Sequence, residues 1–394
     1  MGRIAAYFGA TWGLLAVLAG TWHPAAGAGV LLAAAYTTLP LFAFLRAGGT
    51  WRRYPTRAFR LAVVRPTLYA QLLLPLVAGA AALGLLGGLF VGRAASSGRW
   101  AAAAMLAVGA VVLAAGWVGS RRLRVRAVDA HIPGLPPGLD GLRVAQLSDL
   151  HLGPQTSRRF LARVVAATAD AAPDLVVLTG DLVDDRAEDA AGVAAWVAQL
   201  RDAAHPPLGV VAVPGNHDVY AGWPAVADAF ARLAPMHVLV NDALVVRRGD
   251  AALAVVGTGD PAGGRGGGPG GAGPDLPRAF RHVTRGMPVL ALAHNPALFA
   301  PLQAYAPALT LSGHTHWGQL ALPRRGWSLA SPFQEFAMGG YVRGRSLLYV
   351  HPGTGFWGLP FRLGAYPEVA VVTLRAAPEG AEARLVVGEA AGAR

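Results

Sequence analysis

Five short segments of the chain place aspartate, histidine and asparagine just after apolar runs of strand-forming residues. They read Asp149-Leu150-His151-Leu152-Gly153, Gly180-Asp181-Leu182-Val183-Asp184, Gly215-Asn216-His217-Asp218, Ala293-His294-Asn295 and Gly313-His314-Thr315-His316. The chain has no cysteine, so the available ligands are oxygen and imidazole nitrogen, which suit divalent ions such as Mn, Fe or Zn. A pair of such ions polarises a phosphoryl group and generates hydroxide at neutral pH. The five segments therefore predict a two-metal site that hydrolyses a phosphate ester.

Short apolar strands are expected directly before most of these segments. Turn-bounded apolar runs predict strands at Arg143–Leu147, Leu175–Thr179, Val210–Val213, Leu253–Val256, Val289–Ala293, Leu309–Leu311, Leu347–Val350 and Val369–Leu374. Alanine-rich segments predict helices at Arg159–Ala172 and Ala187–Ala203, with a further candidate at Trp223–Ala234. The alternation indicates an α/β fold, and the later run of strands with few helices favours two packed sheets over one doubly wound sheet.

The spacing within the segments favours convergence of their side chains. Asp149 and His151 lie two residues apart, so in extended backbone both point to the same side, and His314 and His316 repeat this spacing. A glycine before Asp181 allows a tight turn. A lone aspartate or histidine is usually an ordinary polar residue, but five such segments in one half of the chain favour a common site.

The five segments resemble the five sequence blocks of the calcineurin-like metallophosphoesterase superfamily, over roughly residues 140–375. The resemblance implies a two-sheet β-sandwich flanked by helices, with a dinuclear site at the strand ends. It also implies hydrolysis of a phosphoester or pyrophosphate bond by attack of a metal-activated hydroxide, without a covalent phosphoenzyme.

The same resemblance assigns roles to individual residues. The implied metal ligands are Asp149, His151 and His316 for one ion, Asn216, His294 and His314 for the second, and Asp181 as the bridge between them. His217 is expected beside the substrate, as an acid for the leaving group or a stabiliser of the transition state. Asp218 is expected to orient the His217 ring, and Asp184 to support the site without binding metal.

Within the superfamily, the chain is similar to a bacterial membrane-associated branch. The similarity rests on Leu311–His316, on Gly353-Thr354-Gly355 and on Arg362-Leu363-Gly364-Ala365, together with the apolar N-terminal segments. That branch includes a UDP-2,3-diacylglucosamine hydrolase of lipid A synthesis. The chain departs from it at Trp317, where the branch has glycine after its His-Thr-His. We expect the indole to narrow the site or contact substrate, so the branch's specificity is not carried over.

Four apolar stretches precede the five segments. They lie at about Ala5–Trp22, Gly27–Leu45, Thr67–Gly92 and Trp100–Ser120, each near the length that crosses a bilayer. None contains an acidic residue, and two contain prolines that membrane spans tolerate. A signal peptide is the alternative for the first stretch, because Ala26-Gly27-Ala28 has the small residues of a cleavage site. Four successive stretches favour a membrane domain.

The arginines predict how this domain is oriented. Residues 1–126 carry thirteen arginines and no acidic residue, whereas the whole chain has a net charge of +12, so residues 127–394 contribute −1. The arginines concentrate in the loop of residues 46–66 and after the fourth stretch, at residues 121–126. Positive loops stay inside, so the catalytic half is expected to face the cytoplasm of a bacterial inner membrane. This distribution favours a membrane role, and no nucleic-acid partner is expected.

The expected organisation is therefore a transmembrane domain at residues 1–120, a linker and entry strand at 121–139, and a metallophosphoesterase domain at 140–394. The expected substrate is a phosphorylated small molecule or a lipid-linked nucleotide such as UDP-2,3-diacylglucosamine. Two alternatives remain open: a broad phosphodiesterase acting on soluble substrates, and a non-catalytic membrane sensor or scaffold. The two divalent ions are not identified by the sequence.

Two further regions need an interpretation. The glycine-rich segment Gly257–Gly273 lacks the spacing of a phosphate-binding loop, and its composition predicts a flexible surface loop. The aromatic stretches Trp327–Tyr341 and Phe356–Phe361 are expected to pack at the edge of the second sheet, the alternative being contact with acyl chains or a bilayer. His351 is expected to be structural, and four other histidines, at 131, 205, 237 and 282, have no supporting spacing.

Overall fold

The computed structural model describes residues 2–46, 56–264, 271–388 and 391–392. The chain separates into two compact units, Met1–Ala115 and Gly116–Arg394. The first unit is helical, and the second contains the sheets and all five metal-site segments.

The N-terminal unit is built mainly from apolar helices, and the last of them, α5, continues for four residues into the second unit. They are α1 (Gly2–Gly20), α2 (Pro24–Arg46), α3 (Arg57–Phe59), α4 (Arg65–Leu89) and α5 (Ala94–Gly119), with a π-helical segment at Arg60–Val64 that leads into α4. Among the described residues, three helical segments are long and apolar enough to cross a membrane: α2, Arg60–Leu89 and α5. The first expected stretch forms the shorter apolar helix Ala5–Gly20. All four stretches are thus helical, but three of them meet the length and hydropathy of a span.

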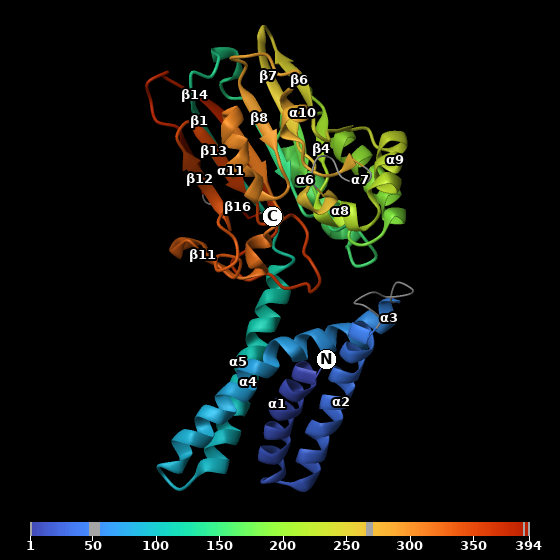
Figure 1. Ribbon diagram of the computed structural model, residues 1–394, viewed down its shortest axis with the longest axis vertical. Coiled ribbons are helices and arrows are strands. Elements are labelled where there is room, and N and C mark those ends of the chain that lie inside the picture. The colour runs from blue at the N-terminus through green and yellow to red at the C-terminus, as the bar shows by residue number, and fades with distance from the viewer. Residues whose placement is uncertain (1, 47–55, 265–270, 389–390, 393–394) are drawn as a thin grey trace. The chain divides into compact units, whose positions relative to one another are not determined.

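Two larger sheets build the C-terminal unit (Figure 1). The larger has the strand order β15-β1-β14-β2-β3-β4-β5, with β16 beside β1. Its strands are β1 (Arg124–Pro133), β2 (Arg143–Leu147), β3 (Leu175–Thr179), β4 (Val210–Val213), β5 (His237–Val238), β14 (Glu368–Ala377), β15 (Arg384–Val387) and β16 (Ala391–Gly392). From β2 to β5 neighbouring strands run parallel.

The smaller of these sheets has the order β12-β13-β9-β8-β7-β6. Its strands are β6 (Asp242–Arg248), β7 (Ala251–Gly257), β8 (Val289–Leu292), β9 (Leu309–Ser312), β12 (Gly339–Arg343) and β13 (Ser346–Val350). The four strands β7, β8, β9 and β13 run parallel. A separate two-stranded pair, β10 (Ala321–Leu322) and β11 (Trp327–Ser328), follows the last metal-site segment.

The core lies between the two larger sheets, and helices cover their outer faces. On β3, Leu175 and Val177 pack between the sheets, whereas Val176 and Leu178 pack against helices, as the two-residue alternation of a strand requires. The helices on that outer face are α6 (Arg158–Asp170), α7 (Ala190–Ala204) and α9 (Trp223–Leu233) (Figure 1). The short helices α10 (Leu276–Phe280) and α11 (Phe299–Leu302) accompany the other sheet. The predicted α/β fold of two packed sheets flanked by helices is confirmed.

The segment 121–139, expected to be a linker and entry strand, contains the ten-residue strand β1. Strand β1 pairs in parallel with β14 along ten residues, from Arg124 opposite Glu368 to Pro133 opposite Ala377, and its other edge pairs with β15. β1 is therefore an interior strand of the larger sheet.

The expectation of a flexible surface loop at Gly257–Gly273 is wrong for its described ends. Gly259, Gly263 and Gly273 are buried, and a Cβ on Gly273 would lie 1.9 Å from the Gly264 carbonyl oxygen. The buried Asn241 side chain donates to the Gly273 carbonyl and accepts from the Gly259 amide. Glycine is abundant there because two backbone segments approach each other closely. Residues 265–270, which include Arg265 and Pro269, lie outside the described residues, as do Arg52 and Arg53 of the expected cytoplasmic loop.

Candidate metal centre

All five metal-site segments begin where a parallel strand ends. Strands β2, β3 and β4 of the larger sheet lead to Asp149, Asp181 and Asn216, and strands β8 and β9 of the smaller sheet lead to His294 and His314. The carboxyl ends of parallel strands share one edge of a sheet, which is a common place for ligands. The two sheets therefore contribute their ligands to one site from opposite sides of the core.

The ligand-bearing residues do not continue the extended backbone of their strands. Asp149, His151, Asp181, His314 and His316 all have positive φ, between 43° and 70°. Such values are uncommon for residues other than glycine and cost free energy, and they concentrate at functional sites. The expectation that pairs two residues apart converge because the backbone is extended is therefore wrong in its reasoning: left-handed turns direct these side chains together.

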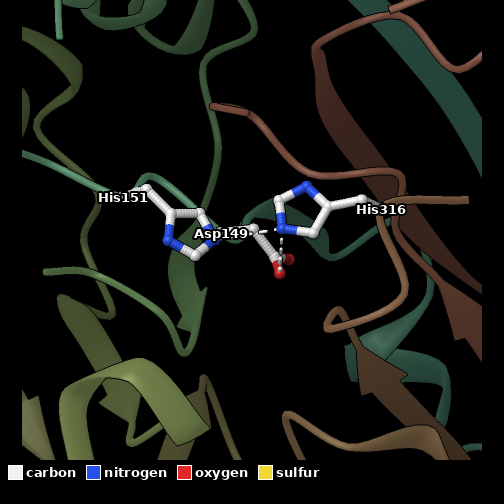
Figure 2. A group of neighbouring side chains, drawn as sticks. All are labelled: Asp149, His151 and His316. Carbon is white, nitrogen blue, oxygen red and sulfur yellow. Dashed lines mark hydrogen bonds and ion pairs between the residues drawn. The ribbon is translucent and has the colours of Figure 1, made fainter. Parts of the chain in front are cut away.

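The first predicted ligand set is compact. The Nε2 atoms of His151 and His316 lie 3.0 Å apart, and Nε2 of His316 lies 3.3 Å from Oδ1 of Asp149. Figure 2 shows the two rings on either side of the Asp149 carboxylate. All three side chains are buried. Two imidazoles and a carboxylate converging in this way are suited to hold a divalent cation.

The second predicted set lies on the other side of Asp181. His294 donates its Nδ1–H to the Thr179 carbonyl at 2.7 Å, so the lone pair of Nε2 faces Oδ2 of Asp181 and Oδ1 of Asn216, each at 3.2 Å. Nδ1 of His314 lies 2.7 Å from the same Asn216 oxygen. These oxygens can be approached by Nε2 only with a proton or a metal cation between them, so this donor set fits a metal ion.

Asp181 lies between the two sets. Its Oδ2 is 3.2 Å from Nε2 of His294 and 3.7 Å from Nε2 of His151, so one carboxylate oxygen approaches a ligand of each expected ion. Burial disfavours the charged carboxylate, but His294, His151 and His217 outweigh burial and hold the pKa of Asp181 well below its usual range. The pKa of His294 is raised despite burial, chiefly by Asp181. The negative field that retains a proton on His294 is the field that would attract a metal cation.

Two of the predicted ligand imidazoles, those of His314 and His316, stay neutral. Burial and, after it, the neighbouring His294 lower the pKa of His314 to about 4. Burial also lowers the pKa of His316 well below its usual value, with Arg362 as the next cause. Neutral imidazole is the form that binds a metal.

His217 is oriented by a backbone carbonyl. Its Nδ1–H donates to the carbonyl oxygen of Asp184 at 2.8 Å, and its ring lies edge-on to that of His151 at 4.6 Å between centroids. Asp218 accepts instead from the amides of Leu182 and Val183, and through its other oxygen from Gly215. The expectation that Asp218 orients the His217 ring is therefore wrong; Asp218 fixes the backbone of two metal-site segments to each other.

Arg362 is a buried site residue to which the sequence assigned no role. Its guanidinium donates to Nδ1 of His316 at 2.8 Å and to the carbonyl oxygens of His316 and Pro352. Its side chain is fully buried, and burial lowers its pKa to about 9. These bonds fix the His316 ring with Nε2 toward Asp149 and His151. No signal in the chain marked Arg362 as a partner of His316, because 46 residues separate them.

A pocket of about 410 Å³ is lined by several of the predicted metal ligands. Its lining includes polar side chains, those of Asp181, Asn216, His217, His314 and His316, and the apolar side chains of Leu329, Phe333 and Trp357. Phe333 is 80% exposed and Trp357 is 54% exposed. The indole of Trp357 lies 6.2 Å from the His217 ring. We call the five polar residues the polar floor of the pocket and the three apolar residues its apolar wall.

The expectation of simple packing for the aromatic stretches holds only in part. Phe336 is buried against Phe299 and Tyr341, at the edge of the smaller sheet. Phe333 and Trp357 instead remain exposed beside the metal ligands because each lies in a loop outside the sheet.

Trp317 is not among the described residues that line the metal pocket. Its side chain is buried, packs with Ala321 and Ala365, and donates its indole N–H to the Val350 carbonyl at 2.8 Å. Its backbone is left-handed, with φ of 49°, and this turns the side chain toward the core. The expectation that Trp317 narrows the site or contacts substrate is therefore wrong.

The other histidines lie apart from the ligand sets. His351 is buried, and its Nδ1 accepts from the Gly353 amide at 2.9 Å, so it supports the loop that follows β13. His205, His237 and His282 are exposed, and His131 is half-buried within β1. The seven residues predicted as metal ligands and His217 come together, and Asp184 adds an Oδ1 at 3.3 Å from Nδ1 of His151.

Several known proteins are similar in sequence to this chain. The profile of the calcineurin-like phosphoesterase family matches residues 142–318. A "Transmembrane protein with metallophosphoesterase domain" of Danio rerio is 32% identical over 269 residues, which cover 64% of this chain and 58% of that protein. The chain thus spans little more than half of that relative's length. An uncharacterized metallophosphoesterase of Aquifex aeolicus is 31% identical over 258 residues, which cover 64% of this chain and 92% of that protein.

Among solved structures, the protein TT1561 of Thermus thermophilus is 16% identical, with a TM-score of 0.37, over 54% of this chain and 90% of that protein.

Proposed function

Because this chain belongs to the calcineurin-like metallophosphoesterase family, we propose that it is a membrane-anchored phosphohydrolase that uses two divalent metal ions to cleave a phosphoester or pyrophosphate bond. The observation that carries the proposal is the convergence of the seven predicted ligands, with His217 lining the same pocket. The ligands are oxygen and imidazole nitrogen only, which suits Mn, Fe or Zn.

Two divalent ions held by these ligands supply polarisation of the phosphoryl group and a lowered pKa for water. The chain itself positions the proton chemistry. Since His217 donates Nδ1–H to the Asp184 carbonyl, Nε2 is the ring atom that remains to exchange a proton with a substrate oxygen. The Asp218 carboxylate accepts hydrogen bonds from the amides of Leu182, Val183 and Gly215. These bonds fix the position of the segment that carries Asp181 relative to the segment that carries His217.

The apolar wall of the pocket supports a substrate with an apolar group beside its phosphate. Leu329, Phe333 and Trp357 are all exposed there, although large apolar side chains are usually buried. A lipid-linked nucleotide such as UDP-2,3-diacylglucosamine combines a pyrophosphate for the polar floor with acyl chains for this wall. We therefore propose this class over soluble nucleotides.

The proposed location is a bacterial inner membrane, with several spans and with the catalytic unit on the cytoplasmic side. Three helices with the length and hydropathy of membrane spans support it, as does the name of the Danio rerio relative. The concentration of arginines in residues 46–66 and 121–126 supports the cytoplasmic orientation.

The test is UMP release from UDP-2,3-diacylglucosamine by the full-length protein in detergent with added Mn, beside a soluble aryl phosphodiester. His217→Ala is compared with His282→Ala, which removes an exposed histidine outside the pocket. We expect turnover to fall about 100- to 1,000-fold in His217→Ala, with bound metal retained, and to stay unchanged in His282→Ala. Trp357→Ala should raise KM for the lipid-linked substrate more than for the diester.

The outcomes separate the alternatives. Cleavage of the diester without UMP release would keep two-metal hydrolysis and discard the lipid-linked nucleotide. Unchanged turnover in His217→Ala would contradict the assignment of its proton transfer. Metal binding without cleavage of either substrate would favour a non-catalytic sensor or scaffold.

A further inference from the structure

A second hollow of the C-terminal unit is lined by arginines. This groove, of about 1580 Å³, contains Arg121, Arg122, Arg124, Arg126, Arg163, Arg324 and Arg325. They come from three parts of the chain: the segment from the end of α5 into β1, helix α6, and the turn between β10 and β11. No aspartate or glutamate lines the groove within the described residues. We call it the arginine groove.

Most of this charge has no carboxylate partner. Arg126 pairs with Glu368 at 2.6 Å, whereas the other six guanidinium groups form no ion pair within the described part of the chain. Arg163 donates to the Arg121 carbonyl, and Arg121 donates to the Trp117 carbonyl. Burial lowers the pKa of Arg124, and Arg126 and Arg122 lower it further. The groove therefore gathers positive charges that repel one another, which a bound anion would relieve.

An aromatic ring orders part of the groove. The guanidinium carbon of Arg124 lies 4.0 Å from the centre of the Tyr366 ring, and that of Arg122 lies 5.6 Å from it. Contact with a ring face holds a guanidinium while leaving its N–H groups to donate. Planar forks of N–H donors match the oxygens of a phosphate group. Phosphate is therefore the anion that these residues are best placed to bind.

The turn that contributes Arg324 and Arg325 also carries exposed apolar residues. In the β10–β11 pair, Leu322 and Trp327 flank the two arginines and are 49% and 38% exposed. Both arginines are exposed as well. Arginine and tryptophan side by side on an exposed turn are typical of segments that contact the interfacial region of a bilayer. This turn would contact the region of the bilayer where head groups meet acyl chains, while the arginine groove contacts the head groups.

We propose that the arginine groove binds the phosphate of an anionic phospholipid head group and thereby docks the catalytic unit on the membrane surface. The position of the groove in the chain selects a lipid over a free phosphate. Helix α5, which has the length and hydropathy of a membrane span, ends at Gly119, two residues before Arg121. Two extended residues span about 7 Å, so the first arginines lie within reach of the head groups at the end of that span. The inference does not depend on catalysis.

The test measures lipid retention by the full-length protein in detergent micelles. The protein is delipidated, titrated with phosphatidylglycerol or phosphatidylcholine, and the bound lipid is counted by native mass spectrometry. Arg324→Gln/Arg325→Gln is compared with Arg278→Gln/Arg281→Gln, which neutralises two exposed arginines outside the groove. We expect wild type to prefer phosphatidylglycerol, and Arg324→Gln/Arg325→Gln to weaken its binding about tenfold while the control pair leaves it unchanged.

Further measurements make each result decisive. The thermal unfolding midpoint and turnover of a soluble phosphodiester should stay unchanged in Arg324→Gln/Arg325→Gln, and if this variant misfolds, Arg122→Gln replaces it. Equal retention of the two lipids, or equal loss in the control pair, would overturn the proposal. Millimolar inorganic phosphate that displaces phosphatidylglycerol completely would also overturn it, because the groove would then bind free anions.

Discussion

At the scale of single residues, the candidate metal site depends on backbone conformations that most residues avoid. Asp149, His151 and Asp181 each have positive φ, as do His314 and His316. Hydrogen bonds hold these turns: the amides of Asp149 and His151 donate to the carbonyls of Gly180 and Asp181, and the His314 amide donates to the Asp149 carboxylate. Each left-handed residue costs roughly 1–2 kcal/mol, so the rest of the fold must compensate for the site.

Replacing the carboxylate between the two ligand sets should release both ions. Asp181→Asn keeps the shape but removes the charge that lies 3.2 Å from His294 and 3.7 Å from His151. We expect bound metal to fall below one ion per chain and turnover to drop by more than about 100-fold, beyond the loss typical of residues that only support a ligand. Metal analysis by mass spectrometry beside a turnover assay checks this, with His282→Ala as the control. Two ions retained in Asp181→Asn would contradict the bridging role.

His351 should make the domain sensitive to mild acid. Burial lowers its pKa to about 4, below the usual value of 6.5, so the unfolded chain binds a proton first as the pH falls. The stability that this histidine contributes is present above pH 6.5 and is lost between pH 6.5 and 4, by up to about 3 kcal/mol. His351→Asn can still accept from the Gly353 amide but does not titrate. We expect wild type with chelator to lose stability over this window more steeply than the variant.

Thermal unfolding at half-unit steps of pH measures the difference. Parallel curves for wild type and His351→Asn would contradict the assignment, because groups other than His351 titrate alike in both proteins.

At the scale of elements, the turns that directly follow the strands determine how closely the predicted ligands approach one another. Gly180 leaves β3 with φ of +86°, and a Cβ there would lie 2.6 Å from Nδ1 of His294. A Cβ on Gly313, after β9, would lie 2.3 Å from Oδ2 of Asp149. Glycine at these exits lets ligands from one sheet pack against the backbone of the other. The turns are therefore part of the metal site, although their glycines bind no metal.

Comparing Gly180→Ala with Gly209→Ala should separate the cost of backbone strain from the effect of a steric clash with His294. Both glycines have φ near +85°, but a Cβ on Gly209 would meet no atom within 4 Å. We expect each variant to lose about 1–2 kcal/mol of stability from the left-handed backbone. Gly180→Ala alone should also weaken metal binding, because its methyl group displaces the His294 ring. Denaturant unfolding without metal and metal titration provide the two measurements. Equal metal affinity in the two variants would contradict this account.

At the scale of the whole molecule, β1 joins the charged segment after α5 to the fold of the catalytic unit. It lies between β14 and β15, and Leu123, just before it, is buried beside the helices of the larger sheet. Arg126 within β1 pairs with Glu368 of β14. A fragment that contains the complete larger sheet must therefore begin before β1.

The position of the cut should decide whether the catalytic unit folds alone. A fragment that begins at Arg121 keeps β1 and should unfold cooperatively, whereas one that begins at Gly134 exposes the edges of β14 and β15 to solvent and should not. Circular dichroism during heating distinguishes them. A cooperative transition in the shorter fragment would show that β1 is dispensable.

Much of the fold could be predicted from local sequence. Strands β2, β3 and β4 have the expected bounds, and α6, α7 and α9 differ from the prediction by at most three residues at either end. These elements are short, strongly apolar and bounded by turns, so local pattern and burial agree. Elements missed include the edge strand β6, in which only Val246 is buried, and β12, which begins with two glycines. Their pairing depends on neighbours distant in the chain.

The sequence by itself determined the residue types of the candidate ligands, the order of the five segments and the apolar helices that precede them. Ligand type is a property of single residues, and the segments are local. Only the tertiary structure decided that Arg362 holds His316, that the Asp184 carbonyl orients His217, and that Trp317 faces the core. It also brought Arg163, Arg324 and Arg325 to the arginines that follow α5. These contacts join residues from separate elements through backbone turns and packing, which no local spacing encodes.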